Sequence, residues 1–127
     1  MKVVLDWMKS LCPLSDETIR ELEACVTPCY FPKKHLLVRE GIFCKYAYFI
    51  EKGMTRSYWL VDGEEFTTSF AYDGCIVFSM DELYYNQVSQ EFVETLEEVQ
   101  AYRILITDLR RLWETNLELS NWGRIIH

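Results

Sequence analysis

Apolar residues near the N-terminus follow the spacing of an amphipathic helix. Val4, Met8 and Leu11 recur three or four positions apart, so they share one helical face. The residue before a proline is disfavoured in the α conformation, so Pro13 marks the end of this segment. The pattern predicts a helix over residues 2–11.

A second helical pattern begins at Ser15. The serine hydroxyl can accept a hydrogen bond from a free amide of the first turn, and the two acidic residues that follow suit the positive end of the helix dipole. Apolar side chains then return at Ile19, Leu22 and Val26, again at helical spacing. We predict a helix over residues 15–26.

The pattern changes between residues 29 and 106 to short runs rich in aromatic and β-branched residues. Glycine or proline separates many of these runs at intervals of roughly 8 to 12 residues, which is typical of a barrel or jelly roll. The expected strands are Tyr30–Phe31, Leu36–Arg39, Tyr46–Glu51, Met54–Leu60, Glu65–Phe70, Ile76–Phe78, Phe92–Leu96 and Val99–Ile106.

Helical spacing returns after the last strand. Asp108 is an expected N-cap, and Leu109 and Leu112 begin an apolar face. We predict C-terminal helices within residues 108–127. With 127 residues, the chain can bury one sizeable core, so residues 1–127 are expected to form one domain of mainly β class with flanking helices.

The most informative stretch is Tyr46–Phe70. Breaks at Gly53 and Gly63 turn three successive strands back on one another, because glycine adopts positive φ without steric cost. The order of an apolar run, a glycine, Arg56-x-Tyr58 and then Asp-Gly-Glu resembles the effector domain of the CRP/FNR family of transcription regulators. The resemblance covers nearly the whole chain and implies a double-stranded β-helix, a jelly roll of the cyclic-nucleotide-binding type.

In that family a long final helix pairs with its twin in a dimer and leads to a helix-turn-helix DNA-binding domain. This sequence contains only the start of such a helix, so the resemblance implies a sensor domain that is either a fragment of a longer regulator or stands alone. An apolar stripe at the end of the chain needs a partner unless it folds back on the roll. We therefore expect a homodimer with an interface that includes Leu119, Trp122, Ile125 and Ile126.

Family members that bind cyclic nucleotides anchor the ligand with two charged residues: a Glu accepts from the ribose hydroxyl, and an Arg pairs with the cyclic phosphate. The matching segment here begins at Gly74, its Gly-Glu positions read Phe78 and Ser79, and its Arg-Ser/Thr positions fall around Ser89. No Lys or Arg occurs in residues 57–102. A cyclic phosphate buried there would lack a cation, at a cost of several kcal/mol.

Binding of cyclic AMP in the usual way is therefore not expected. The pocket positions supplied by the resemblance carry small or neutral groups, which suit a small neutral effector. They are Ser57, Thr68, Ser69, Phe78, Ser79 and Ser89. The alternative is that Phe78 and its neighbours fill the roll as core and that no ligand binds.

Charge and cysteine content narrow the function further. A net charge of −7 would repel a phosphate backbone, so this chain alone is not expected to bind DNA. No stretch approaches the ~20 apolar residues of a membrane span, which leads us to expect a cytoplasmic protein with no membrane partner. The odd number of cysteines favours reduced core thiols over a disulfide framework. These cysteines are Cys12, Cys25, Cys29, Cys44 and Cys75.

Enzyme chemistry is not expected. Cupin enzymes share the roll but hold a metal with two or three histidines and a carboxylate, a set that His35 and His127 cannot supply. Cys25 and Cys29 are the closest cysteine pair, and an iron–sulfur cluster needs four thiolates. Cys44, beside a lysine, stays open as a redox-active thiol. No nucleophile with a base and an orienting acid is recognisable, and we expect no cofactor.

Together these observations predict an effector-sensing and dimerisation domain of a CRP/FNR-like regulator. It would reach DNA only through a helix-turn-helix domain absent from this sequence. Two alternatives remain: a stand-alone β-roll interaction module without a ligand, and a small cupin-like enzyme.

Overall fold

The computed structural model describes residues 1–127 except 79–84, 86, 88 and 127. Its helices are α1 (Lys2–Leu11), α2 (Asp16–Cys25), α4 (Ile106–Thr115) and α5 (Leu117–Ile125). Its strands are β1 (Val26–Phe31), β2 (Leu36–Val38), β3 (Tyr46–Lys52), β4 (Thr55–Val61), β5 (Glu64–Ala71), β6 (Ile76–Val77), β7 (Phe92–Thr95) and β8 (Val99–Leu105). Within the described residues, no helix combines the length and apolar character needed to cross a bilayer.

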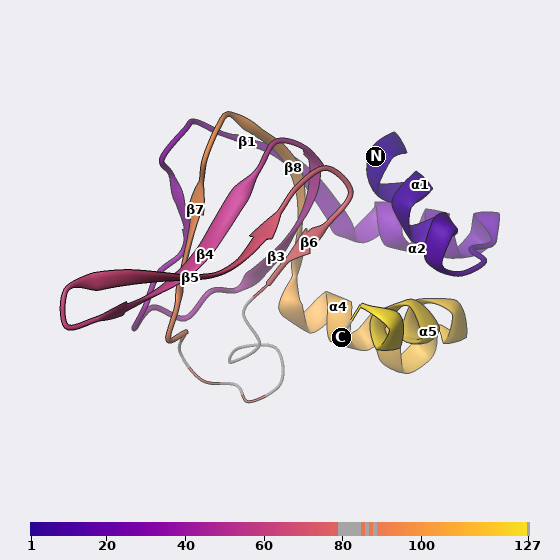
Figure 1. The fold of residues 1–127 in the computed structure, drawn as a ribbon. Coiled ribbons are helices and arrows are strands. Elements are labelled where there is room, and N and C mark those ends of the chain that lie inside the picture. The colour runs from indigo at the N-terminus through magenta and orange to yellow at the C-terminus, as the bar shows by residue number, and fades with distance from the viewer. Residues whose placement is uncertain (79–84, 86, 88, 127) are drawn as a thin grey trace.

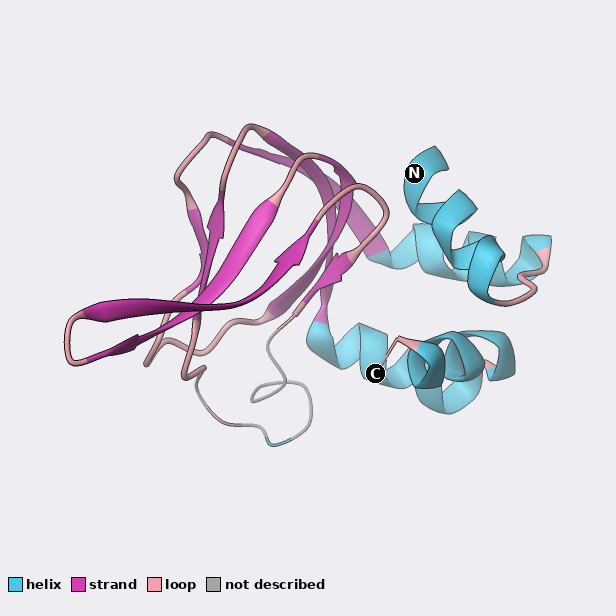
Figure 2. Ribbon diagram, viewed as in Figure 1, coloured by secondary structure: helices cyan, strands magenta, loops and turns pink. Residues whose placement is uncertain are grey.

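The described strands form two antiparallel sheets, in the orders β1-β8-β3-β6 and β2-β7-β4-β5. Figure 1 shows these sheets as a roll, with the labelled helices gathered at one side. In Figure 2 the N-terminal and C-terminal helices belong to the same group, and the β4–β5 hairpin projects from the opposite side of the roll. The predicted jelly roll with flanking helices is confirmed.

Strand β3 separates two hydrophobic cores, because successive side chains on a strand point to opposite faces. Ala47 and Phe49 belong to the core shared with the helices, while Tyr48 and Ile50 belong to the core inside the roll. All four side chains are at least nine-tenths buried. A strand that is apolar on both faces is what this sandwiched position requires.

One local and one long-range set of hydrogen bonds fix the N-terminal ends of α2 and α1. The Ser15 side chain accepts from the Thr18 N–H at 3.3 Å, so the predicted cap of α2 is confirmed. The Glu51 carboxylate on β3 accepts from the N–H groups of Val3 and Val4 at 3.2 and 3.1 Å, which caps α1 from outside the helix.

Several strands begin or end one residue away from the prediction, and two differences have a clear tertiary cause. Helix α4 begins at Ile106 and not at Asp108, because the Ile106 N–H already donates to the Lys45 carbonyl at 2.8 Å. The first strand begins at Val26, since β1 pairs with β8 along its full length. Both differences arise from partners that are distant in sequence.

The apolar stripe at the end of the chain folds back on the roll. Leu119 and Trp122 are only 1% and 2% exposed, and the Trp122 ring stacks on Phe49 with centroids 5.9 Å apart. Ile126 packs against the same core, and Ile125 is 50% exposed. Of the four residues of the expected dimer interface, Leu119 and Trp122 have partners within the chain and Ile125 is the most exposed, while the dimer itself stays a prediction.

Candidate functional site

Two of the predicted pocket residues lie side by side in the sheet. Ser57 on β4 and Ser69 on β5 are register partners, and Ser57 also lies opposite Val93 on β7. Register partners in an antiparallel pair point to the same face, so both serines share the face of Val93, which is buried inside the roll. Thr68 is the extra residue of a bulge, and its hydroxyl donates to the Ser57 carbonyl at 3.2 Å.

Ser89 is buried, but its hydroxyl has local partners. It donates to the Glu91 carbonyl at 3.1 Å and accepts from the Glu91 N–H at 3.2 Å. The Ser89 carbonyl accepts from the Gly41 N–H at 2.9 Å, which fixes this segment against the turn at Gly41. Ser89 therefore stabilises the backbone around it. Ser79 lies outside the described residues.

Described side chains of both sheets pack together inside the roll. Tyr48, Ile50, Val93 and Val99 lie in its core, together with Val77 of β6. Burial, with a smaller contribution from Cys44, raises the pKa of the Tyr48 phenol, so this side chain stays neutral. Half-buried Ser57 lies opposite Val93 of this core, whereas Ser69 and Thr68 on β5 are exposed.

Phe78 lies on the other side of sheet β1-β8-β3-β6. Val77 points into the roll, whereas Ile76 and Phe78 pack against the core shared with the helices. Side-chain alternation along β6 explains the difference, because neighbouring residues face opposite ways. Phe78 therefore lies on the opposite side of this sheet from the core beside Ser57, and the predicted ligand pocket as a whole stays a prediction.

Phe78 instead lines a cavity of about 300 Å³ between α1, β6 and α5. Its described lining carries no Asp, Glu, Lys, Arg or His; it comprises Trp7, Leu11, Gly74, Cys75, Ile76, Phe78, Trp122, Ile125 and Ile126. Trp7 and Ile125 are 41% and 50% exposed. This composition suits a small apolar molecule and gives no electrostatic stabilisation to an anion.

Gly74 allows helix α1 to approach the wall of this cavity, called the Phe78 cavity below. A Cβ atom at Gly74 would lie 2.9 Å from Cβ of Trp7, closer than two carbon atoms can pack. Its N–H donates to the Ile50 carbonyl at 2.7 Å, which ties the turn to β3. Gly74, at the position where the family's phosphate segment begins, leaves room for the Trp7 side chain.

The cation that precedes Ser57 in the sequence already has ion-pair partners. Arg56 on β4 forms ion pairs with Glu65 on β5 and with Glu94 on β7, and its guanidinium lies 4.2 Å from the Tyr58 ring centroid. The hydrogen bond to Glu65 is the main cause of the raised pKa of Arg56. Sequence reasoning missed this cluster because only the register Arg56↔Glu94 reveals it.

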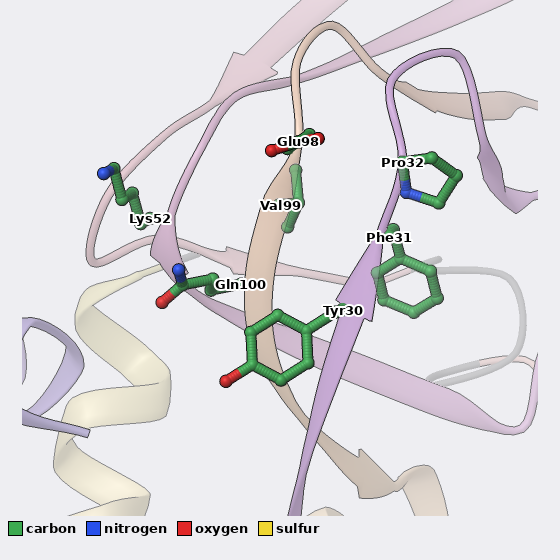
Figure 3. A pocket seen from close by; sticks show the side chains of 7 residues that line it. All are labelled: Tyr30, Phe31, Pro32, Lys52, Glu98, Val99 and Gln100. Atoms are coloured by element: carbon green, nitrogen blue, oxygen red, sulfur yellow. The ribbon is translucent and has the colours of Figure 1, made fainter.

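A larger opening of about 430 Å³ lies along β1 and β8 (Figure 3). Tyr30, Lys52 and Glu98 are among its walls, and Tyr30 is 74% exposed. The two charges have opposite signs, so this surface offers no net attraction to an ion.

Metal and thiol chemistry find no support in the described part of the chain. No group of three or more His, Cys, Asp or Glu side chains there could hold a metal ion. The five cysteines, all within the described residues, form no disulfide; Cys12 is buried, and the others are partly buried. Burial raises the pKa of the Cys12 and Cys29 thiols, which disfavours the reactive thiolate.

A family profile described as Cyclic nucleotide-binding domain matches residues 28–116. The chain belongs to the cyclic nucleotide-binding domain family. The match begins within β1 and extends through the other strands and α4. No curated protein matches the chain at the level of sequence.

Solved structures with the fold of this cyclic nucleotide-binding domain include proteins of several kinds. A regulatory subunit of a cAMP-independent protein kinase A from Trypanosoma brucei aligns with TM-score 0.78 and 15% identity, over 98% of this chain and 42% of that one. The catabolite activator protein of Thermus thermophilus aligns with TM-score 0.75 and 15% identity, over 89% and 54%. The sensor domain of the transcriptional regulator DNR from Pseudomonas aeruginosa aligns with TM-score 0.74 and 18% identity, over 90% and 75%.

These likenesses establish the fold of the domain. The chain spans about half or less of the trypanosomal and Thermus proteins. Within the family fold, sequence reasoning located the strands but not the Phe78 cavity. A signal was present: Ile76 and Phe78 alternate with Val77, and Trp7 and Ile125 follow helical spacing, but no local pattern shows that these segments meet.

Proposed function

We propose that this cyclic nucleotide-binding domain is the effector-sensing and dimerisation domain of a CRP/FNR-like transcription regulator and that its effector is a neutral apolar molecule. The uncharged Phe78 cavity is the observation that carries the proposal. The absence of Lys and Arg from residues 57–102 supports it, because a cyclic phosphate would find no cation in the matching segment. The fold shared with DNR and the catabolite activator protein is consistent with this role.

The cavity lies where a ligand could influence the C-terminal helices. Phe78 follows β6 of the roll, while Ile125 and Ile126 lie at the end of α5. A molecule that contacts both sides would favour the arrangement of α5 that it fits best, and so shift the population between arrangements. DNA would then be contacted through a helix-turn-helix domain outside these residues. In this proposal the domain is a cytoplasmic homodimer without catalytic activity.

Indole is a suitable probe, because it is neutral, flat and small enough for about 300 Å³. We expect saturable methyl shifts in NMR spectra at Ile76 and Ile125, with slower hydrogen exchange in α5. Ile126→Trp should fill the cavity and abolish the shifts. Leu117→Trp, a matched change at a 76% exposed position of the same helix, should leave them intact. Shifts that map elsewhere, or equal binding by both variants, would contradict the site.

A specific surface favours the second candidate, an interaction module without a ligand. The β4–β5 hairpin exposes large apolar side chains, each 44–54% accessible: Trp59, Leu60, Val61, Phe66 and Phe70. Asp62, Glu64 and Glu65 surround its tip, so a basic apolar surface would be complementary. If the double variant Trp59→Ser with Phe66→Ser no longer binds a basic partner protein but still binds indole, the hairpin is an interaction surface that is separate from the Phe78 cavity.

A further inference from the structure

The opening along β1 and β8, called the Tyr30 groove below, is bordered by side chains from three neighbouring strands (Figure 3). Tyr30 on β1 is the register partner of Gln100 on β8, and Gln100 is also the register partner of Lys52 on β3. Register partners point to the same face of a sheet. The three side chains therefore form one row across the sheet, about 10 Å from end to end because neighbouring strands lie about 4.8 Å apart.

The walls of the Tyr30 groove include one cation and one anion. Lys52 supplies an ammonium group and Glu98 a carboxylate. The segments that carry them are in contact, since an added Cβ at Gly53 would lie 2.9 Å from the Glu98 carbonyl oxygen. Even so, Lys52 and Glu98 do not form one of the ion pairs among the described residues. A ligand that carries both charges would fit between two such groups.

The side of the groove formed by β1 is apolar and open. Tyr30 is 74% exposed, and Pro32, two residues further along the chain, is exposed as well. An aromatic ring placed on Tyr30 gains from ring stacking in addition to the apolar area that it buries. The opening of about 430 Å³ is large enough for one ring with a short charged chain.

The backbone on both sides of the groove is held by side-chain hydrogen bonds. The Thr95 hydroxyl donates to the Pro32 carbonyl at 2.7 Å. The Gly53 N–H, next to Lys52, donates to the Asp73 carboxylate at 2.8 Å. A ligand would therefore meet walls that are already in place, which lowers the entropic cost of binding.

We propose that the Tyr30 groove binds the zwitterion of an α-amino acid with an aromatic side chain. The ligand carboxylate would face Lys52, its ammonium would face Glu98, and its ring would stack on Tyr30. The Gln100 amide lies in the middle of the row, where it can donate to the carboxylate and accept from the ammonium. The groove shares no lining residue with the Phe78 cavity, and the proposal does not depend on the proposed function.

L-Phenylalanine is the probe. Three comparison molecules each lack one of its groups: phenethylamine lacks the carboxylate, 3-phenylpropanoate lacks the ammonium, and L-alanine lacks the ring. We expect L-phenylalanine to bind with a dissociation constant of about 1 mM or below, and each comparison molecule to bind at least about fivefold more weakly. NMR shifts should map to Tyr30, Val99 and Gln100 and leave the methyl groups of Ile76 and Ile125 unchanged, which distinguishes this groove from the Phe78 cavity.

Each ligand charge can be assigned to one wall by combining variants with the comparison molecules. In Lys52→Gln, L-phenylalanine should lose its advantage over phenethylamine and keep its advantage over 3-phenylpropanoate. In Glu98→Gln, it should lose its advantage over 3-phenylpropanoate and keep its advantage over phenethylamine. A general change in net charge would not produce this crossed pattern.

Lys9→Gln and Glu97→Gln are the matched controls, because they remove the same charges at exposed positions that do not line the groove. Each should change the affinity for L-phenylalanine less than about twofold. All four variants alter exposed side chains and should keep the wild-type urea midpoint, which excludes unfolding as the cause. Equal affinity for L-phenylalanine and both singly charged molecules, an unchanged preference in Lys52→Gln and Glu98→Gln, or shifts confined to residues outside the groove would each overturn the proposal.

Discussion

Glu118, in the first turn of α5, is the hydrogen-bond partner of Ser15, the residue that caps α2. Its carboxylate accepts from the Ser15 N–H at 3.0 Å and from the Ser15 hydroxyl at 2.8 Å, and it also accepts from the Thr18 hydroxyl. The N-terminal and C-terminal helices are therefore joined at a carboxylate. If α5 moves in response to an effector, then either α2 moves with it or the hydrogen bonds to Glu118 break.

The Glu118 contact predicts a pH-dependent stability. Hydrogen bonds from Thr18, and then from Ser15, hold the pKa of this carboxyl below its usual value. A group with a lowered pKa in the folded state contributes stability that is fully present above its unfolded pKa of ~4.3 and is lost as pH falls through the folded pKa. Glu118→Gln should therefore lower the urea midpoint at pH 7 and have little effect near pH 2.

Glu114→Gln is the matched control, because Glu114 is exposed on α4 and makes none of the described hydrogen bonds. Its urea midpoint should follow that of the wild type at both pH values. A loss in Glu118→Gln that is the same at pH 7 and near pH 2 would show that the charge of Glu118 contributes nothing.

Gly53 should tolerate no side chain. Its φ is +127°, and an added Cβ would lie 2.8 Å from Cγ2 of Val99 and 2.9 Å from the Glu98 carbonyl oxygen. Gly53→Val combines backbone strain with a clash, so we expect a loss of at least ~2 kcal/mol in the free energy of unfolding. The measurement is urea denaturation followed by circular dichroism.

The control variant Gly63→Val separates the cost of backbone strain from the cost of the steric clash. Gly63 also has positive φ, +82°, but an added Cβ would meet nothing within 4 Å. The control should therefore lose less stability than Gly53→Val. Equal urea midpoints for Gly53→Val and Gly63→Val would mean that the clash with Val99 does not add to the loss of stability.

The strands were predictable because their signals are local. Gly53 and Gly63 mark turns, and the residues between them include the strand formers Tyr58, Trp59 and Val61. The start of α4 was not predictable, since Asp108 is a good capping residue and the competing partner, the Lys45 carbonyl, lies far away in sequence. Likewise an amphipathic stripe specifies that Trp122 needs a partner but not that Phe49 of the same chain supplies it.

Cyclic AMP should not bind. Neither the Glu nor the Arg of the family's phosphate segment occurs at the matching positions Phe78, Ser79 and Ser89, and Arg56 is held by Glu65 and Glu94. Isothermal titration calorimetry should detect no heat of binding up to about 1 mM, which corresponds to ~4 kcal/mol. A micromolar dissociation constant would contradict the proposed neutral effector.

The proposed homodimer now rests on Ile125, because Trp122 is buried in its own chain. Ile125 and Trp7 expose apolar surface beside each other at the mouth of the Phe78 cavity, and two such surfaces could bury one another across a two-fold axis. We expect a dimer at about 100 μM by gel filtration with light scattering, and a shift to monomer in Ile125→Glu, since a buried unpaired carboxylate costs several kcal/mol.

Leu117→Glu is the matched control for the dimer, because Leu117 is 76% exposed on the same helix and does not line the Phe78 cavity. The same charge is added to α5, so a general electrostatic effect would act in both variants. Trp122→Glu is unsuitable, since a carboxylate beside Phe49 would unfold the domain before it tested an interface. A monomeric wild type, or dissociation that is equal in Ile125→Glu and Leu117→Glu, would place the interface elsewhere or eliminate it.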